Sequence, residues 1–226
     1  PWTKLNANTT GNGLLGSSFS GVDLTGWVPP NDQKIAGVNL SNTSNVPWAT
    51  LNSNTDSQDF GTNTYNGDFS GLDLTGWTPI ARELSYVKFS GVTHIPWAAI
   101  NAADLYQAID FSNMDLSSWT PAANKSINYC DFSGATNIPW AAISAVTVNL
   151  NIGIQSNFTG QNLTDWNPNT SMVLANINYT DATNIPWTAI NANTSSSVPQ
   201  FTGMFKSNFT NADLSGSSKK RWCQTF

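Results

Sequence analysis

Charged residues are scarce in this chain. Only 10% of its 226 residues are Asp, Glu, Lys or Arg, whereas soluble proteins carry about a quarter. The nine basic residues form no stripe along the chain, so we expect no nucleic-acid partner. No apolar run approaches the length of a membrane span, so we expect no membrane insertion. A neutral, polar surface of this kind is typical of extracellular or virion-surface proteins.

The side chains that catalysis uses are equally scarce. His94 is the only histidine and Glu83 is the only glutamate. A Ser–His–Asp site would have to use His94, and no Gly-x-Ser-x-Gly motif accompanies it. Paired-carboxylate and metal–histidine chemistry have little material to work with. We therefore expect no catalytic residue, no metal site and no cofactor.

Cysteine is too rare for a disulfide framework, since the chain has only Cys130 and Cys223. Cys130 occupies a slot where small residues face inward, so we expect a buried thiol. Cys223 lies beyond the last recognisable repeat. Whether it is free or paired between subunits stays open.

The chain does contain repeats. A first module reads Phe-Ser/Thr-x-x-Asp/Asn-Leu-Ser/Thr-x-Trp and spans residues 19–27, 69–77, 111–119 and 158–166, with a partial copy at 209–214. A second module starts with a large apolar residue and ends in Val/Ile-Pro-Trp-Ala/Thr-Ala/Thr-Ile/Leu. It spans residues 40–51, 89–100, 132–143 and 179–190. Alternating modules of this kind predict a stack of similar units.

Large apolar residues recur five residues apart, as from Phe69 to Leu74. This step fits neither a helix nor a flat strand, and it predicts a chain that turns a corner every five residues. Alternation along each side predicts that the residue two before each large one also points inward. Small residues such as Ala49, Ala98 and Ala141 fit that slot. Arg82, Lys125 and Gln161 do not, and they predict sides that bulge outward.

Two segments, Leu72-Asp-Leu-Thr-Gly and Ala212-Asp-Leu-Ser-Gly, resemble the pentapeptide-repeat family. The resemblance is degenerate, because Trp-x-Pro and Ile-Pro-Trp segments are inserted. It implies an all-β fold, a right-handed quadrilateral parallel β-helix (solenoid). The repeats predict roughly ten coils in a single domain over residues 1–216, followed by a C-terminal tail or cap over 217–226.

Tryptophan forms two sets in register with the modules. One set is Trp27, Trp77, Trp119 and Trp166, and the other is Trp48, Trp97, Trp140 and Trp187. Packing alone favours such columns in a repeat protein. An alternative is a carbohydrate-binding adhesin in which Trp48, Trp97, Trp140 and Trp187 stack on sugar rings. Of the two columns, we expect this second one to be exposed at the surface.

Polar residues recur between the apolar ones. Asp23, Asp73, Asp115 and Asp213 are interpreted as solvated turn residues rather than calcium ligands, since no dense ligand cluster accompanies them. His94 aligns with Asn45, Asn137 and Asn184 and is interpreted as a turn residue as well. Asn-x-Ser/Thr sequons make glycans possible partners, and they begin at Asn8, Asn39, Asn42, Asn124, Asn157, Asn162, Asn169, Asn178, Asn193 and Asn208.

The two ends of the sequence are in phase with one another. The chain starts partway through a second module and stops after a first module, so the end of one subunit could continue into the next. Folding of the tail over the open edge is the alternative. We therefore predict a non-enzymatic structural protein, a rigid repeat subunit or spacer of an extracellular filament or virus particle. Its partners would be other copies of itself or other structural subunits.

Overall fold

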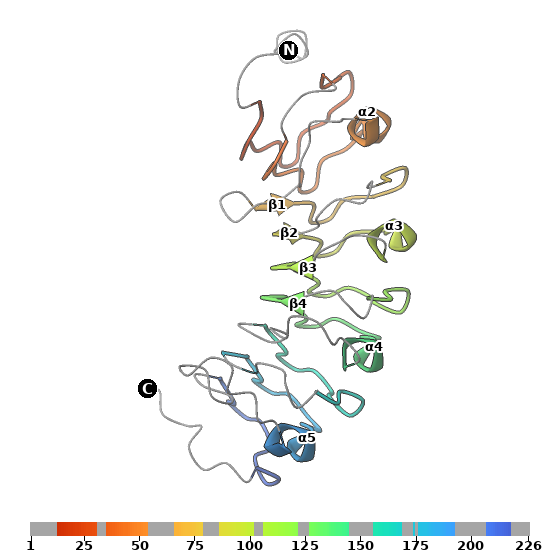
Figure 1. Ribbon diagram of the computed structural model, residues 1–226. Helices are drawn as coiled ribbons and strands as arrows, with labels where there is room; N and C mark the ends of the chain where they lie inside the picture. Colours follow the sequence, from red (N-terminus) through yellow and green to blue (C-terminus); the bar gives the residue numbers. More distant parts are fainter. Residues whose placement is uncertain are drawn as a thin grey trace. The chain divides into compact units, whose positions relative to one another are not determined.

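A computed structural model describes residues 13–30, 35–53, 66–78, 86–101, 106–121, 127–144, 156–168, 174, 176–192 and 207–217. The chain divides into two compact units, Pro1–Leu105 and Tyr106–Phe226. Both units are built from short, laterally paired segments (Figure 1). Each is considered by itself below.

The Pro-Trp segments are short helices, labelled in Figure 1: α2 (Trp48–Ser53), α3 (Trp97–Asn101), α4 (Trp140–Ser144) and α5 (Trp187–Ala192). Each follows a proline, whose ring presets the backbone for the first helical turn. The carbonyl of Pro47 accepts a bond of 3.0 Å from Leu51 N, and Pro139 bonds Ile143 N at the same distance. These helices were not expected from the sequence, which predicted a β-type side there.

In the first unit, parallel pairing joins successive modules. The bridges Ser18–Asn39 and Asn39–Asp68 lead into β1 (Gly67–Asp68), which pairs in parallel with β2 (Val87–Lys88). Four segments are thus joined side by side, and we call each one a rung. A second line of bridges, such as Asp23–Ser44, joins the two modules of one repeat and, among the described residues, does not continue to the next repeat.

The second unit repeats this arrangement. Its β3 (Tyr106–Gln107) pairs in parallel with β4 (Ile127–Asn128). Parallel bridges join five further positions into one line of rungs, namely Asp110, Asp131, Asn157, Asn178 and Asn208. The described strands make only two two-stranded sheets, so the right-handed quadrilateral β-helix stays a prediction, as does the single domain.

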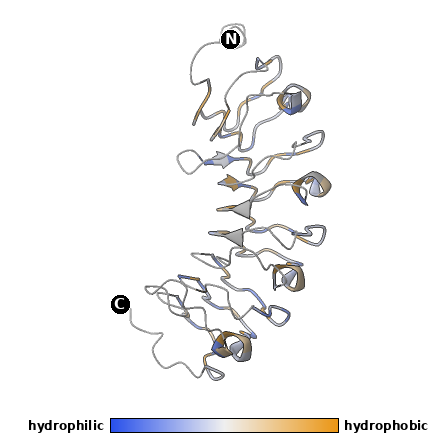
Figure 2. Cartoon of the chain, viewed as in Figure 1, coloured by the Kyte–Doolittle hydropathy of each residue, from blue (hydrophilic) through white to orange (hydrophobic). Residues whose placement is uncertain are grey.

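The core of each unit is a column of large side chains, one from each rung. In the second unit these are Phe111, Phe132, Phe158, Tyr179 and Phe209, all buried. Ring centroids of consecutive members lie 5.7, 5.8, 5.8 and 4.9 Å apart. Such distances are typical of favourable aromatic pairs. Figure 2 shows that hydrophobic residues also gather on α4 and α5.

Left-handed backbone turns separate the apolar positions. Gly16, Gly21 and Gly26, five residues apart, have φ of 65°, 70° and 82°. On each rung the second residue after the core ring is also left-handed. It is Gly in five rungs and Asn or Asp in the others, such as Asn113 and Asp181. These residue types tolerate positive φ best.

The expectation that alternation fixes the inward positions is wrong at several residues. Ala49, Ala98 and Ala141 are exposed because their segments are helical. Gln161 does not mark an outward bulge, since it is 7% exposed. Its Nε2 donates to the carbonyls of Phe132 and Ala135 at 2.6 and 3.2 Å, which satisfies the buried amide. Arg82 and Lys125 lie outside the described residues.

Candidate functional site

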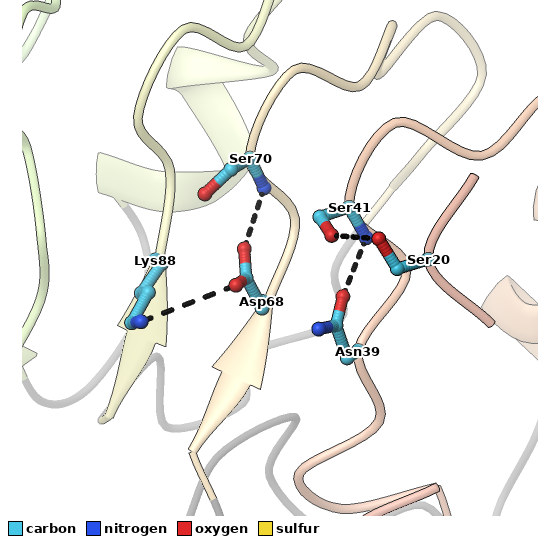
Figure 3. A network of polar contacts seen from close by, with 6 residues as sticks. All are labelled: Ser20, Asn39, Ser41, Asp68, Ser70 and Lys88. Carbon is cyan, nitrogen blue, oxygen red and sulfur yellow. Dashed lines mark hydrogen bonds and ion pairs between the residues drawn. The ribbon is translucent and has the colours of Figure 1, made fainter. Parts of the chain in front are cut away.

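An outward polar face accompanies the core column. On every rung, the residues just before and just after the core side chain point away from it. We call these two lines of residues the polar ladder. Figure 3 shows the ladder in the first unit, where side chains from neighbouring rungs lie beside one another, from Ser20 to Lys88.

Ladder residues within one rung cap each other. Asn39 Oδ1 accepts from Ser41 N at 2.8 Å, and Asp68 Oδ1 accepts from Ser70 N at 3.0 Å (Figure 3). Such side-chain-to-backbone bonds hold the tight turn that follows. Asn, Asp, Ser and Thr therefore recur here for a structural reason.

Other ladder contacts run between rungs. Ser41 Oγ donates to Ser20 Oγ at 2.8 Å, and Lys88 Nζ lies 4.0 Å from Asp68 Oδ2. The ion pair is partly exposed, so it adds little stability. The hydroxyl bond links the first and second rungs of the first unit.

A second capped turn carries the Asp residues of the first module. Asn45 Nδ2 donates to Asp23 Oδ1 at 2.9 Å, and Thr25 N donates to the same oxygen at 2.9 Å. The bond from Asn45, followed by those from Thr25, lowers the pKa of Asp23. These carboxylates thus act as turn caps. Among the described residues, no group of three or more His, Cys, Asp or Glu side chains is placed to hold a metal ion.

Histidine occupies this same turn in one repeat. His94 has φ of 52°, as do Asn137 and Asn184. Its Nδ1 lies 3.0 Å from Asp73 Oδ1, where the other repeats place an amide nitrogen. The alignment of His94 with Asn residues was predicted from the sequence, and the geometry confirms it.

Burial decides what the tryptophans can contact. Trp27, Trp77, Trp119 and Trp166 are 1–2% exposed. Trp48, Trp140 and Trp187 are 7%, 7% and 8% exposed, and only Trp97 is intermediate. The expectation that this second column is the exposed one is therefore wrong for three of its four members. The helical turn after each proline directs these indoles toward the core rings, with Trp140 5.4 Å from Phe158.

Two of the second-column indoles also bond the next module. Trp48 Nε1 donates to Asp73 O at 3.3 Å, and Trp187 Nε1 donates to Asp213 O at 2.9 Å. Amides at the ends of the same helices add similar bonds, from Asn52 to Gly76 O at 2.7 Å and from Asn191 to Gly216 O at 3.1 Å. We call this set of bonds the helix interlock. The only sign of these bonds in the sequence is the recurrence of Trp and Asn four residues apart.

Some of the sequon asparagines lie in the described part of the chain and others do not. Asn8, Asn124, Asn169 and Asn193 lie outside the described residues, as do Glu83 and Cys223. Asn42, Asn162 and Asn208 are exposed, whereas Asn39, Asn157 and Asn178 are half-buried. In several sequons the Asn side chain caps its own Thr, as in Asn162, which accepts from Thr164 N at 3.1 Å and Thr164 Oγ1 at 2.7 Å. The sequon pattern is thereby explained without glycans, and glycosylation stays a prediction.

Cys130 is fully buried, as expected for a small inward residue. Burial raises the pKa of its thiol to about 12. Because the thiolate is the reactive form, this cysteine has the environment of a structural residue.

Comparison with known proteins finds no matching family model, no matching curated protein and no matching solved structure. None of the helices in the described part of the chain has the length and apolarity needed to cross a bilayer.

Proposed function

We propose that this chain is a non-enzymatic structural protein, a rigid repeat subunit or spacer of an extracellular filament or virus particle. The pentapeptide-repeat resemblance and the predicted β-helix belong to this proposal. Partners would be other copies of the chain or other structural subunits, bound through the ends of the repeat stack.

The helix interlock is the observation that carries the proposal. Within the described ranges, backbone pairing joins the two modules of each repeat along both lines of bridges, but it joins successive repeats along only one. Trp48 and Trp187 supply the missing connection by donating to a carbonyl of the next module. A repeat protein whose modules are bonded on two sides resists bending and shear, which is what a spacer requires.

The site chemistry supports the same conclusion. The described carboxylates, Asp23 and its counterparts, are occupied as turn caps with lowered pKa values. A general acid or base needs a pKa near neutrality, and these carboxylates are shifted in the opposite direction.

The carbohydrate-binding adhesin that uses Trp48, Trp97, Trp140 and Trp187 is disfavoured by burial. A sugar ring stacks on an exposed indole face, and three of these four indoles are packed against core rings.

Electron microscopy and intact-mass measurement of native material test the assembly. We expect end-to-end or lattice contacts, and mass in excess of the polypeptide if the sequons are used. A lone monomer of bare mass at high concentration would contradict the assembly.

The interlock has its own test in the purified chain. Trp187→Phe keeps a ring but removes the donor to Asp213 O, so we expect a loss of about 1 kcal/mol beyond the loss of ring volume. Trp166→Phe is the matched control, because Trp166 Nε1 is buried and has no hydrogen-bond partner among the described residues. Equal destabilisation of the two variants in urea would show that the interlock adds nothing.

A further inference from the structure

The polar ladder of the second unit changes from charged to neutral residues along its length. The first two rungs carry Asp110 with Ser112 and Asp131 with Ser133. The next three carry only neutral pairs, namely Asn157 with Thr159, Asn178 with Thr180, and Asn208 with Thr210. These three rungs are joined in order by the bridges Asn157–Asn178 and Asn178–Asn208. They form a neutral array of amides and hydroxyls.

Each neutral pair is held in one geometry by its own hydrogen bonds. Asn157 Oδ1 accepts from Thr159 N at 3.1 Å and from Thr159 Oγ1 at 2.6 Å. The same two bonds measure 3.1 and 2.7 Å on the Asn178 rung and 3.0 and 2.8 Å on the Asn208 rung. The side chains are therefore ordered before any ligand arrives, which reduces the entropy cost of binding.

The capping bonds leave other groups available. The hydroxyl proton of each Thr is used, but its oxygen can still accept. Asn178 Nδ2 donates to Thr159 Oγ1 at 2.9 Å, whereas Nδ2 of Asn157 and Nδ2 of Asn208 have no protein acceptor among the described residues. The Asn208 rung is exposed and the other two are half-buried. The array thus offers amide donors on its first and last rungs and hydroxyl acceptors on Thr180 and Thr210.

We propose that these three rungs bind a neutral, extended, β-linked polysaccharide that runs along the ladder from rung to rung. Parallel pairing places consecutive rungs about 4.8 Å apart, and an extended β-linked glycan presents one sugar ring at a comparable interval. Sugar hydroxyls both donate and accept, as the array does. The ladder pairs of these three rungs carry no charge, which favours a neutral polymer, and Asp110, Asp131 and the exposed Asp181 beside them repel an anionic one.

This proposal goes beyond the structural role and does not depend on it. It also differs from the adhesin alternative, because the contacts come from the polar ladder and not from tryptophan. A spacer that lies against a neutral polysaccharide layer would serve both roles.

Native gel electrophoresis of the full chain in hydroxyethyl cellulose tests the proposal, with calorimetric titration of cellohexaose as the quantitative measurement. We expect retardation by hydroxyethyl cellulose and weaker retardation by carboxymethyl cellulose, which has the same backbone with negative charges. Migration unaffected by hydroxyethyl cellulose, together with no heat from cellohexaose, would overturn the proposal.

A matched pair of variants locates the site. Asn157→Asp keeps the capping oxygen, as Asp110 and Asp131 do on their rungs, but it removes the amide donor and adds a charge. Asn162→Asp makes the same change on the other capped turn, where Asp23 and Asp115 show that Asp is accommodated. We expect cellohexaose affinity to fall at least about 5-fold in the first variant, since one good hydrogen bond is lost, and to stay unchanged in the second.

Three outcomes would contradict polysaccharide binding at the polar ladder. Equal weakening by both variants would indicate a general effect of charge, and no weakening by Asn157→Asp would exclude this rung. Loss of binding in Trp97→Ala with Asn157→Asp unaffected would return sugar binding to tryptophan. Circular dichroism melting of each variant confirms that the fold is intact.

Discussion

His94 Nδ1 and Asp73 Oδ1 lie 3.0 Å apart and replace, in one repeat, the amide-to-carboxylate bond that Asn45 makes to Asp23. The imidazole stands where Asn stands elsewhere, on a left-handed backbone with φ of 52°. Both side chains of the pair are exposed, at 69% and 59%. The contact is thus a surface turn cap with an unusual donor.

His94→Asn should leave the melting temperature unchanged or raise it. Asn tolerates the left-handed conformation better than His does, and its amide reaches the same oxygen in the neighbouring repeats. His94→Val should lower the melting temperature, because a β-branched residue is strained at positive φ. Thermal melting at pH 7 compares the two. A His94→Asn variant that melts well below the parent would show that the imidazole has a role beyond this cap.

Tyr179 is the one core-column ring with a hydroxyl. The hydroxyl oxygen is buried, and no group in the described part of the chain hydrogen-bonds to it. Burial raises the pKa of the phenol well above its ordinary value. Tyr179→Phe keeps the stacked contact with Phe209, whose ring lies 4.9 Å away at 4°. We expect stability to stay equal or to rise by up to about 1 kcal/mol in urea unfolding.

The reverse change is the control for Tyr179. Phe158→Tyr places a new hydroxyl in the same column, and we expect it to cost about 1–3 kcal/mol. Loss of stability in Tyr179→Phe would mean that the hydroxyl has an acceptor.

Sequence alone could predict which residues recur, but not how the second module folds. The five-residue step, the inward Phe and Leu positions and the Asn slot of His94 follow from counting. The Pro-Trp helices do not, because a single turn of helix leaves no periodicity to read in a segment as short as Trp140–Ser144. Because the sequence does not reveal these helices, it predicts that Ala49, Ala98 and Ala141 face inward, whereas they are exposed. For the same reason it predicts an exposed Trp140, whose side chain is buried.

The residues of the polar ladder could be identified from the sequence, but their hydrogen bonds could not. The Asn-x-Thr triplets of the polar ladder are also glycosylation sequons, because a sequon and a capped ladder rung have the same residues at the same spacing. The structure shows that Asn157 Oδ1 accepts two hydrogen bonds from Thr159 of its own rung, which the sequence alone does not indicate. Gln161 is a similar case, because its burial depends on two carbonyls from the preceding rung that no sequence pattern reports.

Gly71 and Gly91 offer a matched test of contact between rungs. Both have left-handed backbone, with φ of 71° and 69°. A Cβ on Gly71 would meet the side chain of Asn42 on the preceding rung, whereas a Cβ on Gly91 would meet no atom of the described residues within 4 Å. We expect each Gly→Ala change to cost roughly 1 kcal/mol for the backbone, with an additional loss for Gly71→Ala. Urea unfolding measures the difference.

Rescue distinguishes a steric cause at Gly71 from a backbone cause. Replacing Asn42 by Gly as well should return the double variant to the stability of Gly91→Ala, after correction for Asn42→Gly alone. If the two single glycine variants are equally stable, the Asn42 side chain moves aside without cost.

Acid should weaken the fold through the capped carboxylates. Hydrogen bonds lower the pKa of four of them, namely Asp23, Asp73, Asp115 and Asp213. A carboxylate whose pKa is lower when folded stabilises the protein above its unfolded pKa, about 3.9, and that stabilisation is lost as pH falls through the folded pKa. We therefore expect constant stability from these groups between pH 5 and 7 and a decline below about pH 4.

Asparagine substitution provides the control for acid unfolding, because Asn162 already fills this position and accepts from Asn184 at 2.9 Å. Asp115→Asn should keep the bond to Asn137 and remove one titrating group, so its urea midpoint should fall less between pH 5 and pH 2 than that of the parent. The fourfold Asn variant should flatten the profile further. If the parent and the fourfold variant lose stability in parallel, acid acts through groups other than these four.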